Sequence, residues 1–191
     1  MTGGKVLVAG VGNLFLGDDG FGVETVRRLA AHPLPEGVEL VDVGVRGVDL
    51  AYRLLDGCRT AVLVDATCRG GAPGTVYLIE ADAEPLEVPV LDGHRMGPDA
   101  VLGLLATLAA GTGGEPPARV LVVGCEPASL EEGIGLSAPV AAAVEEAVRT
   151  VLEAVEEAVL EAVEEAVLEA VEEAVRPEPS SAELERRTTP C

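Results

Sequence analysis

The sequence predicts an α/β fold, in which a mostly parallel, five-stranded twisted sheet carries helices on both faces and so forms three layers. Apolar, β-branched runs alternate along the chain with segments of helical periodicity, the order typical of βαβ units. The run at residues 60–64 is continuously apolar, as expected for a strand that is buried on both faces. The length of 191 residues suffices for one such domain with a sizeable core.

The first half of the domain contains two strands and two helices with clear local signals. Residues 5–10 form an apolar, β-branched run after the initial lysine, which predicts the first strand. Apolar residues at helical spacing predict a helix over residues 20–32, and Pro33 ends it. Residues 38–43 alternate apolar and acidic side chains, the period of a strand, and residues 49–55 form a short helix.

The second half adds three strands, a long loop and a helix. The buried run at residues 60–64 is followed by a Pro-Gly turn and a strand at residues 75–79. Residues 80–98 are acidic, contain prolines and show little periodicity, so we expect a long loop there. Residues 99–110 then have a helical pattern, and residues 119–124 are the last strand.

A low-complexity helix follows from residue 138 and repeats the unit AVLEAVEE with a period of eight. Because eight residues advance a helix by about 80° beyond two full turns, the apolar stripe winds around it and cannot pack along its whole length on one core. We therefore expect an α/β domain over residues 1–152, an acidic helical extension over residues 153–176, and a disordered tail over residues 177–191. The expected state is a monomer, with an oligomer contact through this helix as the alternative.

Composition excludes several classes of function. The formal net charge of −20 argues against binding to nucleic acid and to anionic membrane surfaces. The chain shows no signal-peptide pattern and no uncharged apolar run long enough to span a membrane. Its four cysteines form no C-x-x-C pair and no zinc-binding spacing, and those within or beside apolar runs are expected to be buried thiols. A cytoplasmic, reduced protein is expected.

Three aspartates lie where predicted strands end. Asp19 follows the glycine-rich loop after the first strand, Asp42 lies at the end of the second, and Asp65 directly follows the third. The carboxyl ends of parallel strands form one edge of an open α/β sheet, so these side chains are candidates for a common cleft. His94 from the long loop would add an imidazole, and such a set suits a divalent metal such as nickel, iron or zinc. The alternative for His94 is a solvent-facing loop histidine.

The glycine-rich loop before Asp19 has simpler interpretations as well. Asp18 alone would serve as a helix cap, but one acid suffices for a cap, and Asp19 then needs another explanation. A dinucleotide-binding G-x-G-x-x-G fails because Phe15 occupies the third glycine position, and the G-K-[ST] of phosphate-binding loops is absent. Two aspartates would also repel a phosphate at the helix N-terminus. A nucleotide-binding domain is therefore disfavoured.

Four separated blocks carry a family resemblance. The first block, GVGNLFLGDDGFG at residues 10–22, is similar to G-x-G-N-x-L-x-x-D-[DE]-x-x-G, the opening motif of the hydrogenase maturation proteases. The second and third are VLVDA at residues 62–66 and Gly-His at residues 93–94, and the fourth is EPASLEEGIGL at residues 126–136. They agree with the family in order and spacing, and the resemblance extends over about residues 5–150.

This resemblance implies an endopeptidase of a phosphorylase/hydrolase-like α/β fold. Members of the family remove a C-terminal extension from the large subunit of [NiFe] hydrogenase after nickel has been inserted. The metal-contacting residues of the family correspond here to Asp19, Asp65 and His94, which would contact nickel already held by the substrate. The enzyme itself is then expected to hold no metal tightly, and Asp19, Asp42 and Asp65 are the candidate catalytic carboxylates.

Two mechanisms are compatible with these residues. A metal that bridges protease and substrate would polarise the scissile carbonyl or a water. In the other, Asp19 or Asp42 acts as the general base on water, and metal contact only positions the peptide. The sequence contains neither G-x-S-x-G nor H-E-x-x-H, so nothing indicates a serine or thermolysin-type mechanism.

One block departs from the family pattern. Many members have D-G-G-T-x-G after the second strand, whereas this chain has DVGVRG, in which Val43 and Val45 replace a glycine and the threonine. Arg46, in the variable position, is a candidate partner for a substrate carboxylate. The departure is the basis of a second hypothesis, a non-catalytic chaperone that recognises nickel-loaded hydrogenase subunits through the same cleft.

Overall fold

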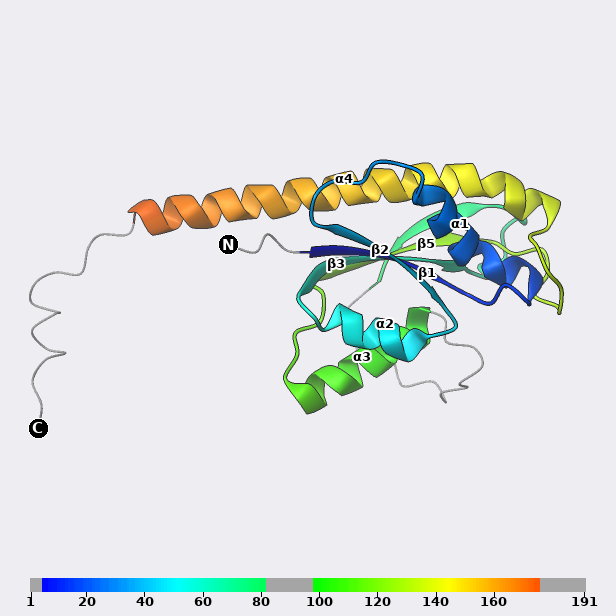
Figure 1. The fold of residues 1–191 in the computed structure, drawn as a ribbon, viewed down its shortest axis with the longest axis horizontal. Coiled ribbons are helices and arrows are strands. Elements are labelled where there is room, and N and C mark those ends of the chain that lie inside the picture. The colour runs from blue at the N-terminus through cyan, green and yellow to red at the C-terminus, as the bar shows by residue number, and fades with distance from the viewer. Residues whose placement is uncertain (1–4, 82–97, 176–191) are drawn as a thin grey trace, which may run out of the picture.

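Five strands form a single sheet in the order β2-β1-β3-β5-β4 (Figure 1). This computed structural model describes residues 5–81 and 98–175. Four of the strands run parallel and β4 is an antiparallel edge strand, so the predicted mostly parallel, five-stranded sheet is confirmed. The strands are β1 (Lys5–Val11), β2 (Val38–Gly44), β3 (Cys58–Ala66), β4 (Val76–Glu80) and β5 (Arg119–Cys125).

Helices cover both faces of the sheet, which confirms the three layers (Figure 1). One face packs against α1 (Phe21–Leu29) and the long α4 (Ala138–Val175), and the other packs against α2 (Gly47–Leu54) and α3 (Pro98–Thr112). A short 3-10 helix, η1 (Gly17–Gly20), leads directly into α1. None of the helices within the described ranges is long and apolar enough to cross a membrane.

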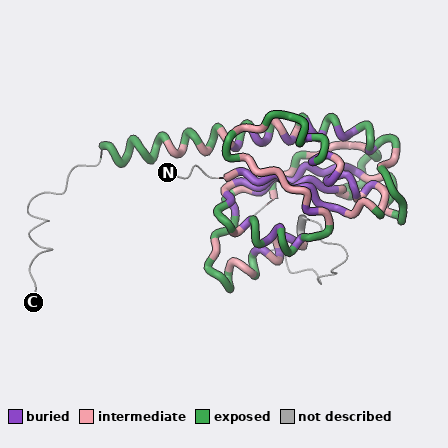
Figure 2. Tube along the Cα trace, in the orientation of Figure 1, coloured by how far each residue is buried: buried purple, intermediate pink, exposed green. Residues whose placement is uncertain are grey.

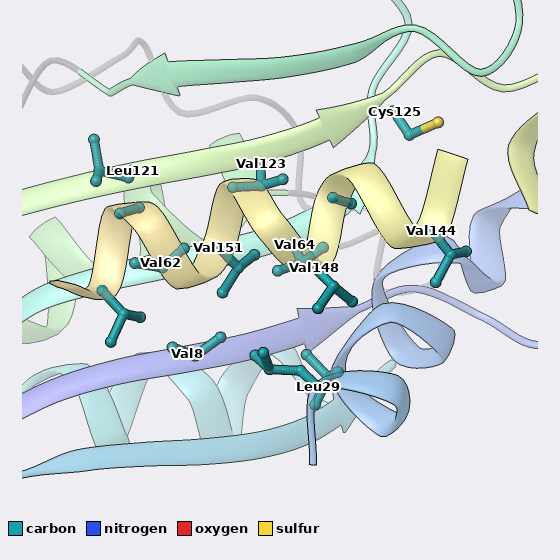
Figure 3. Packing of buried hydrophobic residues seen from close by; sticks show 14 of the residues in the cluster. Val8, Leu29, Val62, Val64, Leu121, Val123, Cys125, Val144, Val148 and Val151 are labelled. Carbon is teal, nitrogen blue, oxygen red and sulfur yellow. The ribbon is translucent and has the colours of Figure 1, made fainter. Parts of the chain in front are cut away.

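The core between α4 and the sheet is built almost entirely from valine, leucine and alanine. Val8, Val62 and Val123 of three neighbouring strands face Val148 and Val151 of α4 (Figure 3). Each of these side chains is buried, and burying one valine contributes roughly 1.5–3 kcal/mol. The chain therefore obtains its stability from many small apolar side chains, in keeping with its low aromatic content.

The first helix lies unusually close to the sheet at its N-terminal end. A Cβ atom at Gly22 would collide with the carbonyl oxygens of Val11 and Val64, and one at Gly10 would collide with the carbonyl oxygen of Gly22. Only glycine at these positions allows the helix backbone to rest on β1 and β3. This close approach fixes η1, with Asp18 and Asp19, directly above the end of β1.

The helix α4 packs on the sheet over a longer stretch than the sequence indicated. We placed the end of the α/β domain at residue 152, but Val155 and Ala158 are fully buried in the core. The reason is that the apolar stripe winds gradually around the helix. One further helical turn of α4 therefore still directs apolar side chains at the sheet before the stripe faces away from it. Beyond this point α4 projects past the edge of the sheet and is mostly exposed (Figure 2).

Some predicted features lie outside the described ranges. These are most of the long loop, with His94, and the tail over residues 177–191.

Candidate active site

Asp42 and Asp65 lie on either side of β1 at the carboxyl edge of the sheet. In the parallel register, Gly10 of β1 pairs with Asp42 of β2 and with Val64 of β3, the residue before Asp65. Asp19 belongs to η1, which follows the loop after β1. All three aspartates therefore occupy the edge where the sequence placed them, and their catalytic and metal-contacting roles remain predictions.

Gly12 brings the carboxylates of Asp19 and Asp65 to the same loop. Its φ angle is 124°, and a Cβ atom there would collide with the main-chain oxygen of Asp19 and lie 3.6 Å from Oδ1 of Asp65. The next residue, Asn13, donates its N–H to Oδ2 of Asp19 over 2.7 Å. Asp19 is half-buried and Asp65 is buried. The main chain of Asp19 and the carboxylate of Asp65 thus flank a point that only glycine can occupy.

Asp42 has a different environment. Side chains alternate across a strand, so Asp42 lies on the α1 side of the sheet with Val64, whereas Asp65 lies on the α2 side. The carboxylate of Asp42 forms an ion pair with Arg27 of α1, with Oδ2 and Nη2 3.3 Å apart. The structure therefore places Asp19 and Asp65 beside Gly12 and gives Asp42 a partner on the opposite face.

Asp18 is a structural anchor that sequence analysis missed. Its side chain is 1% exposed and accepts four hydrogen bonds, from the N–H groups of Ala128, Ser129 and Ser137 and from the hydroxyl of Ser137. Burial alone raises the pKa of Asp18, but the hydrogen bonds together bring this pKa below its ordinary value. The helix-cap interpretation is wrong, because no side-chain cap bond is formed at η1 or α1.

Main-chain hydrogen bonds also join the loop after β1 to the loop between β5 and α4. The N–H of Gly17 donates to the oxygen of Gly133 over 3.0 Å, and the N–H of Gly133 donates to the oxygen of Phe15 over 2.9 Å. The side chains of Phe15 and Ile134 are exposed on these loops. The loop that carries Asp18 and Asp19 is therefore held by a segment more than a hundred residues away in sequence.

Glu126 anchors the loop that follows Asp65. Its buried carboxylate accepts hydrogen bonds from the N–H groups of Arg69 and Gly70, at 2.8 and 3.1 Å, and from the hydroxyl of Tyr77 at 2.9 Å. The bond from Arg69 is the main cause of a lowered pKa of Glu126. The only sequence signal for Glu126 is that it begins the fourth block that resembles the family, EPASLEEGIGL.

The departure from the family pattern after β2 proves to be mainly a packing difference. Val43 is 2% exposed and lies in the core on the α2 side, whereas Val45 is exposed. The guanidinium of Arg46 donates to the main-chain oxygens of Asp42 and Val43, at 2.8 and 3.2 Å. Arg46 thus stabilises its own turn.

Two cysteines of the described residues, Cys58 and Cys125, are buried thiols with raised pKa values. Burial is the main cause that raises the pKa of Cys125, at the end of β5, to about 11, so its thiol stays protonated at neutral pH. Cys58 is buried with a similarly raised pKa, but Cys68 is exposed, contrary to the expectation of a buried thiol. The two buried thiols are therefore poorly suited to act as thiolate nucleophiles or metal ligands at neutral pH.

Within residues 5–81 and 98–175, no three His, Cys, Asp or Glu side chains lie close enough together to hold a metal ion. His94, the third predicted metal contact, lies outside these ranges. Asp19 and Asp65 on their own offer hard oxygen ligands and potential general bases.

Comparison with known proteins identifies the family. The family model of the hydrogenase maturation proteases matches residues 23–154. This chain belongs to the hydrogenase maturation protease family. The hydrogenase 2 maturation protease of Escherichia coli K12 is 35% identical over 153 residues, which cover 79% of this chain and 90% of that protein.

Solved structures of hydrogenase maturation proteases share the fold. The hydrogenase maturating endopeptidase HybD from E. coli aligns with a TM-score of 0.66 at 34% identity, covering 80% of this chain and 93% of HybD. The [NiFe] hydrogenase maturation protease HybD from Thermococcus kodakarensis aligns with a TM-score of 0.61 at 27% identity, covering 79% and 99%. The resemblance to the hydrogenase maturation proteases, seen in four sequence blocks, is thereby confirmed. The chain is a peptide-bond hydrolase of this family.

Proposed function

We propose that this enzyme removes a C-terminal extension from a [NiFe] hydrogenase large-subunit precursor after nickel insertion, and that it recognises the nickel held by that substrate through Asp19, Asp65 and His94. The observation that supports this most is the approach of Asp19 and Asp65 to Gly12, at the edge of the sheet where α/β enzymes bind ligands. Carboxylates and an imidazole are ligands that nickel accepts. Cleavage would then depend on a metal that only the nickel-loaded precursor carries.

The chemistry requires a base and a fixed peptide. Water loses a proton to a carboxylate, its oxygen bonds to the scissile carbonyl carbon, and the C–N bond breaks as the leaving amine takes up a proton. Asp19 is better suited than Asp42 to accept the first proton, because Asp42 is paired with Arg27. Substrate-borne nickel in contact with Asp65 and His94 would hold the peptide beside this base.

A cleavage assay tests this proposal. The full-length protein is mixed with a large-subunit precursor in nickel-loaded and nickel-free forms, and the masses of the products are read by mass spectrometry. We expect loss of a C-terminal peptide from the loaded form alone. Cleavage of both forms at equal rates would contradict nickel recognition, and binding of the loaded form without mass loss would support the chaperone hypothesis instead.

Variants test whether the predicted site residues are needed for cleavage. We expect Asp19→Asn, Asp65→Asn and His94→Ala to abolish cleavage with thermal midpoints close to that of the wild type. Asp56→Asn, an exposed acid in the turn after α2, is the matched control and should cleave normally. If the three site variants process the precursor as the wild type does, the site is misassigned.

A further inference from the structure

The projecting part of α4 is mostly exposed (Figure 2), and it has an apolar stripe on the side away from the domain. Leu160 follows the buried Val151 by nine residues, and Val167 follows the buried Ala158 by nine. Nine residues are about two and a half helical turns, so the stripe and the core-facing surface lie on opposite sides. This outward stripe consists of six side chains that are each more than half exposed, Leu160, Val163, Val167, Leu168, Val171 and Val175.

The outward stripe is continuous and lies far from the active site. Apart from the adjacent pair Val167 and Leu168, its members follow one another at three- and four-residue spacing, so they are neighbours on one helix face. Such contiguous apolar surface marks an interaction site in soluble proteins. The start of α4 lies near the active site, because Ser137, the residue before the helix, donates a hydrogen bond to Asp18. Further along, Glu157 and Glu161 of α4 form ion pairs with Arg119, the first residue of β5. The segment of α4 that carries the stripe therefore extends beyond the opposite, amino edge of the sheet, as the ribbon in Figure 1 shows.

The charges around the outward stripe restrict what can cover it. Residues 159–175 contain six glutamates and neither lysine nor arginine. The glutamates nearest the domain, Glu161 and Glu165, form ion pairs with Arg119 and Arg59. Across the part of the chain that the structure describes, no ion pair involves Glu164, Glu169, Glu172 or Glu173.

Glu164 is the most informative of these acids, because it lies inside the stripe. It is four residues after Leu160 and four before Leu168, with Val163 and Val167 beside it. Any partner that buries these apolar neighbours also takes the carboxylate of Glu164 out of water. Removing a carboxylate from water without a paired cation is strongly unfavourable, so the partner must bring a lysine or arginine to this position.

A second copy of residues 159–175 cannot supply that cation, because this segment contains no lysine or arginine. Two copies of residues 159–175 would bring glutamates against glutamates, and like charges at such positions oppose association. We propose that the outward stripe binds a basic amphipathic helix. The large apolar residues of that helix cover the stripe, and its lysine or arginine residues pair with Glu164 and the flanking glutamates. This is the helix-against-helix mode of recognition, with charge pairs setting the choice of partner.

A set of three synthetic helical peptides tests the chemistry of the partner. The probe is a peptide of about 21 residues, long enough to form a helix, with leucine at the a and d positions of each heptad and lysine at most others. Its two comparison peptides carry glutamate in place of lysine, or serine in place of leucine. Binding to the full-length protein is measured by fluorescence anisotropy at about 150 mM salt, where exposed long-range charge effects are screened. We expect only the leucine–lysine peptide to bind.

Variants of the protein test the place of binding. We expect Leu168→Ser/Val171→Ser to weaken binding by at least about tenfold, and Glu164→Gln to weaken it several-fold. The matched control, Ala162→Ser/Ala166→Ser, adds the same two hydroxyls away from the outward stripe and should bind like the wild type. Each of these helix variants should keep the thermal midpoint of the wild type.

Several results would overturn the proposal. Equal binding of the serine–lysine peptide would show that charge alone attracts the probe, and equal binding of the leucine–glutamate peptide would show that charge has no role. Equal losses in the stripe and control variants would place the site elsewhere. A dimer of the protein alone at neutral pH, dissociated by Leu168→Ser/Val171→Ser, would show that a second copy covers the stripe.

Discussion

The carboxylate of Asp18 holds Ser137 by two hydrogen bonds, one to its N–H at 2.6 Å and one to its hydroxyl at 2.9 Å, across 119 residues of sequence. This pair joins the loop after β1 to the first residue before α4. Asp19 follows Asp18 directly, so the position of a predicted active-site acid depends on an anchor at its neighbour. Two adjacent aspartates therefore have different tasks.

The first prediction concerns Asp18→Asn. The amide keeps the shape of the side chain but turns one acceptor oxygen into a donor, which then faces the N–H and hydroxyl donors of Ala128, Ser129 and Ser137. A buried donor left without an acceptor costs about 1–3 kcal/mol, and more when a charged acceptor is lost. We expect urea denaturation to show a loss of about 3 kcal/mol in the free energy of unfolding.

Asp19→Asn is the matched control for Asp18→Asn, because it makes the same chemical change one residue along the chain at a half-buried site with a single hydrogen bond. It should lose less than about 1 kcal/mol while it abolishes cleavage. Equal denaturation midpoints for the two variants would contradict the anchor role of Asp18.

The second prediction concerns acid stability. The folded state lowers the pKa of Asp18 below 3.8, its value in the absence of these contacts. A lowered pKa stabilises the folded protein at pH values above 3.8, and this contribution is lost as the pH falls through the lower folded value. We expect the difference in unfolding free energy between wild type and Asp18→Asn to be constant between about pH 7 and 5 and to shrink below about pH 4. A difference that grows on acidification would contradict the sign of the shift.

Sequence reasoning recovered the features that depend on local pattern. The strands follow from apolar, β-branched runs, and the positions of Asp42 and Asp65 follow from the rule that parallel strands end at one edge. Pattern does not reveal which face a side chain occupies beyond the end of a strand, or which distant group it meets. The ion pair of Asp42 with Arg27 and the anchoring of Asp18 by Ser137 are long-range contacts of this kind.

The third prediction concerns Gly12→Ala. The methyl group would collide with the main chain of Asp19 and disturb the approach to Asp65, and a φ of 124° is unfavourable for alanine. We expect cleavage to fall at least about a hundredfold, since small displacements of catalytic groups have effects of this size.

Gly57→Ala provides the comparison for Gly12→Ala. Gly57 also has a positive φ, 70°, but a Cβ atom there meets nothing within 4 Å. It should lose about 1 kcal/mol of stability through backbone strain alone and keep full activity. If Gly12→Ala also cleaves at the wild-type rate, the loop does not position Asp19 for the reaction.

The last prediction concerns the length of α4. From the sequence we expect truncation after about Leu152 to leave activity intact, but in the structure it removes the buried side chains of Ala154, Val155 and Ala158. It also removes Glu157 and Glu161, the partners of Arg119. The lost burial corresponds to a decrease of roughly 3–4 kcal/mol in the free energy of unfolding.

Truncation after Glu165 keeps all of these contacts and removes mainly exposed helix, so its thermal midpoint and cleavage rate should match those of the full chain. Equal midpoints for both truncations would show that the last packed turn contributes nothing to the core, and a large loss after Glu165 would show that the projecting segment is part of the folded unit.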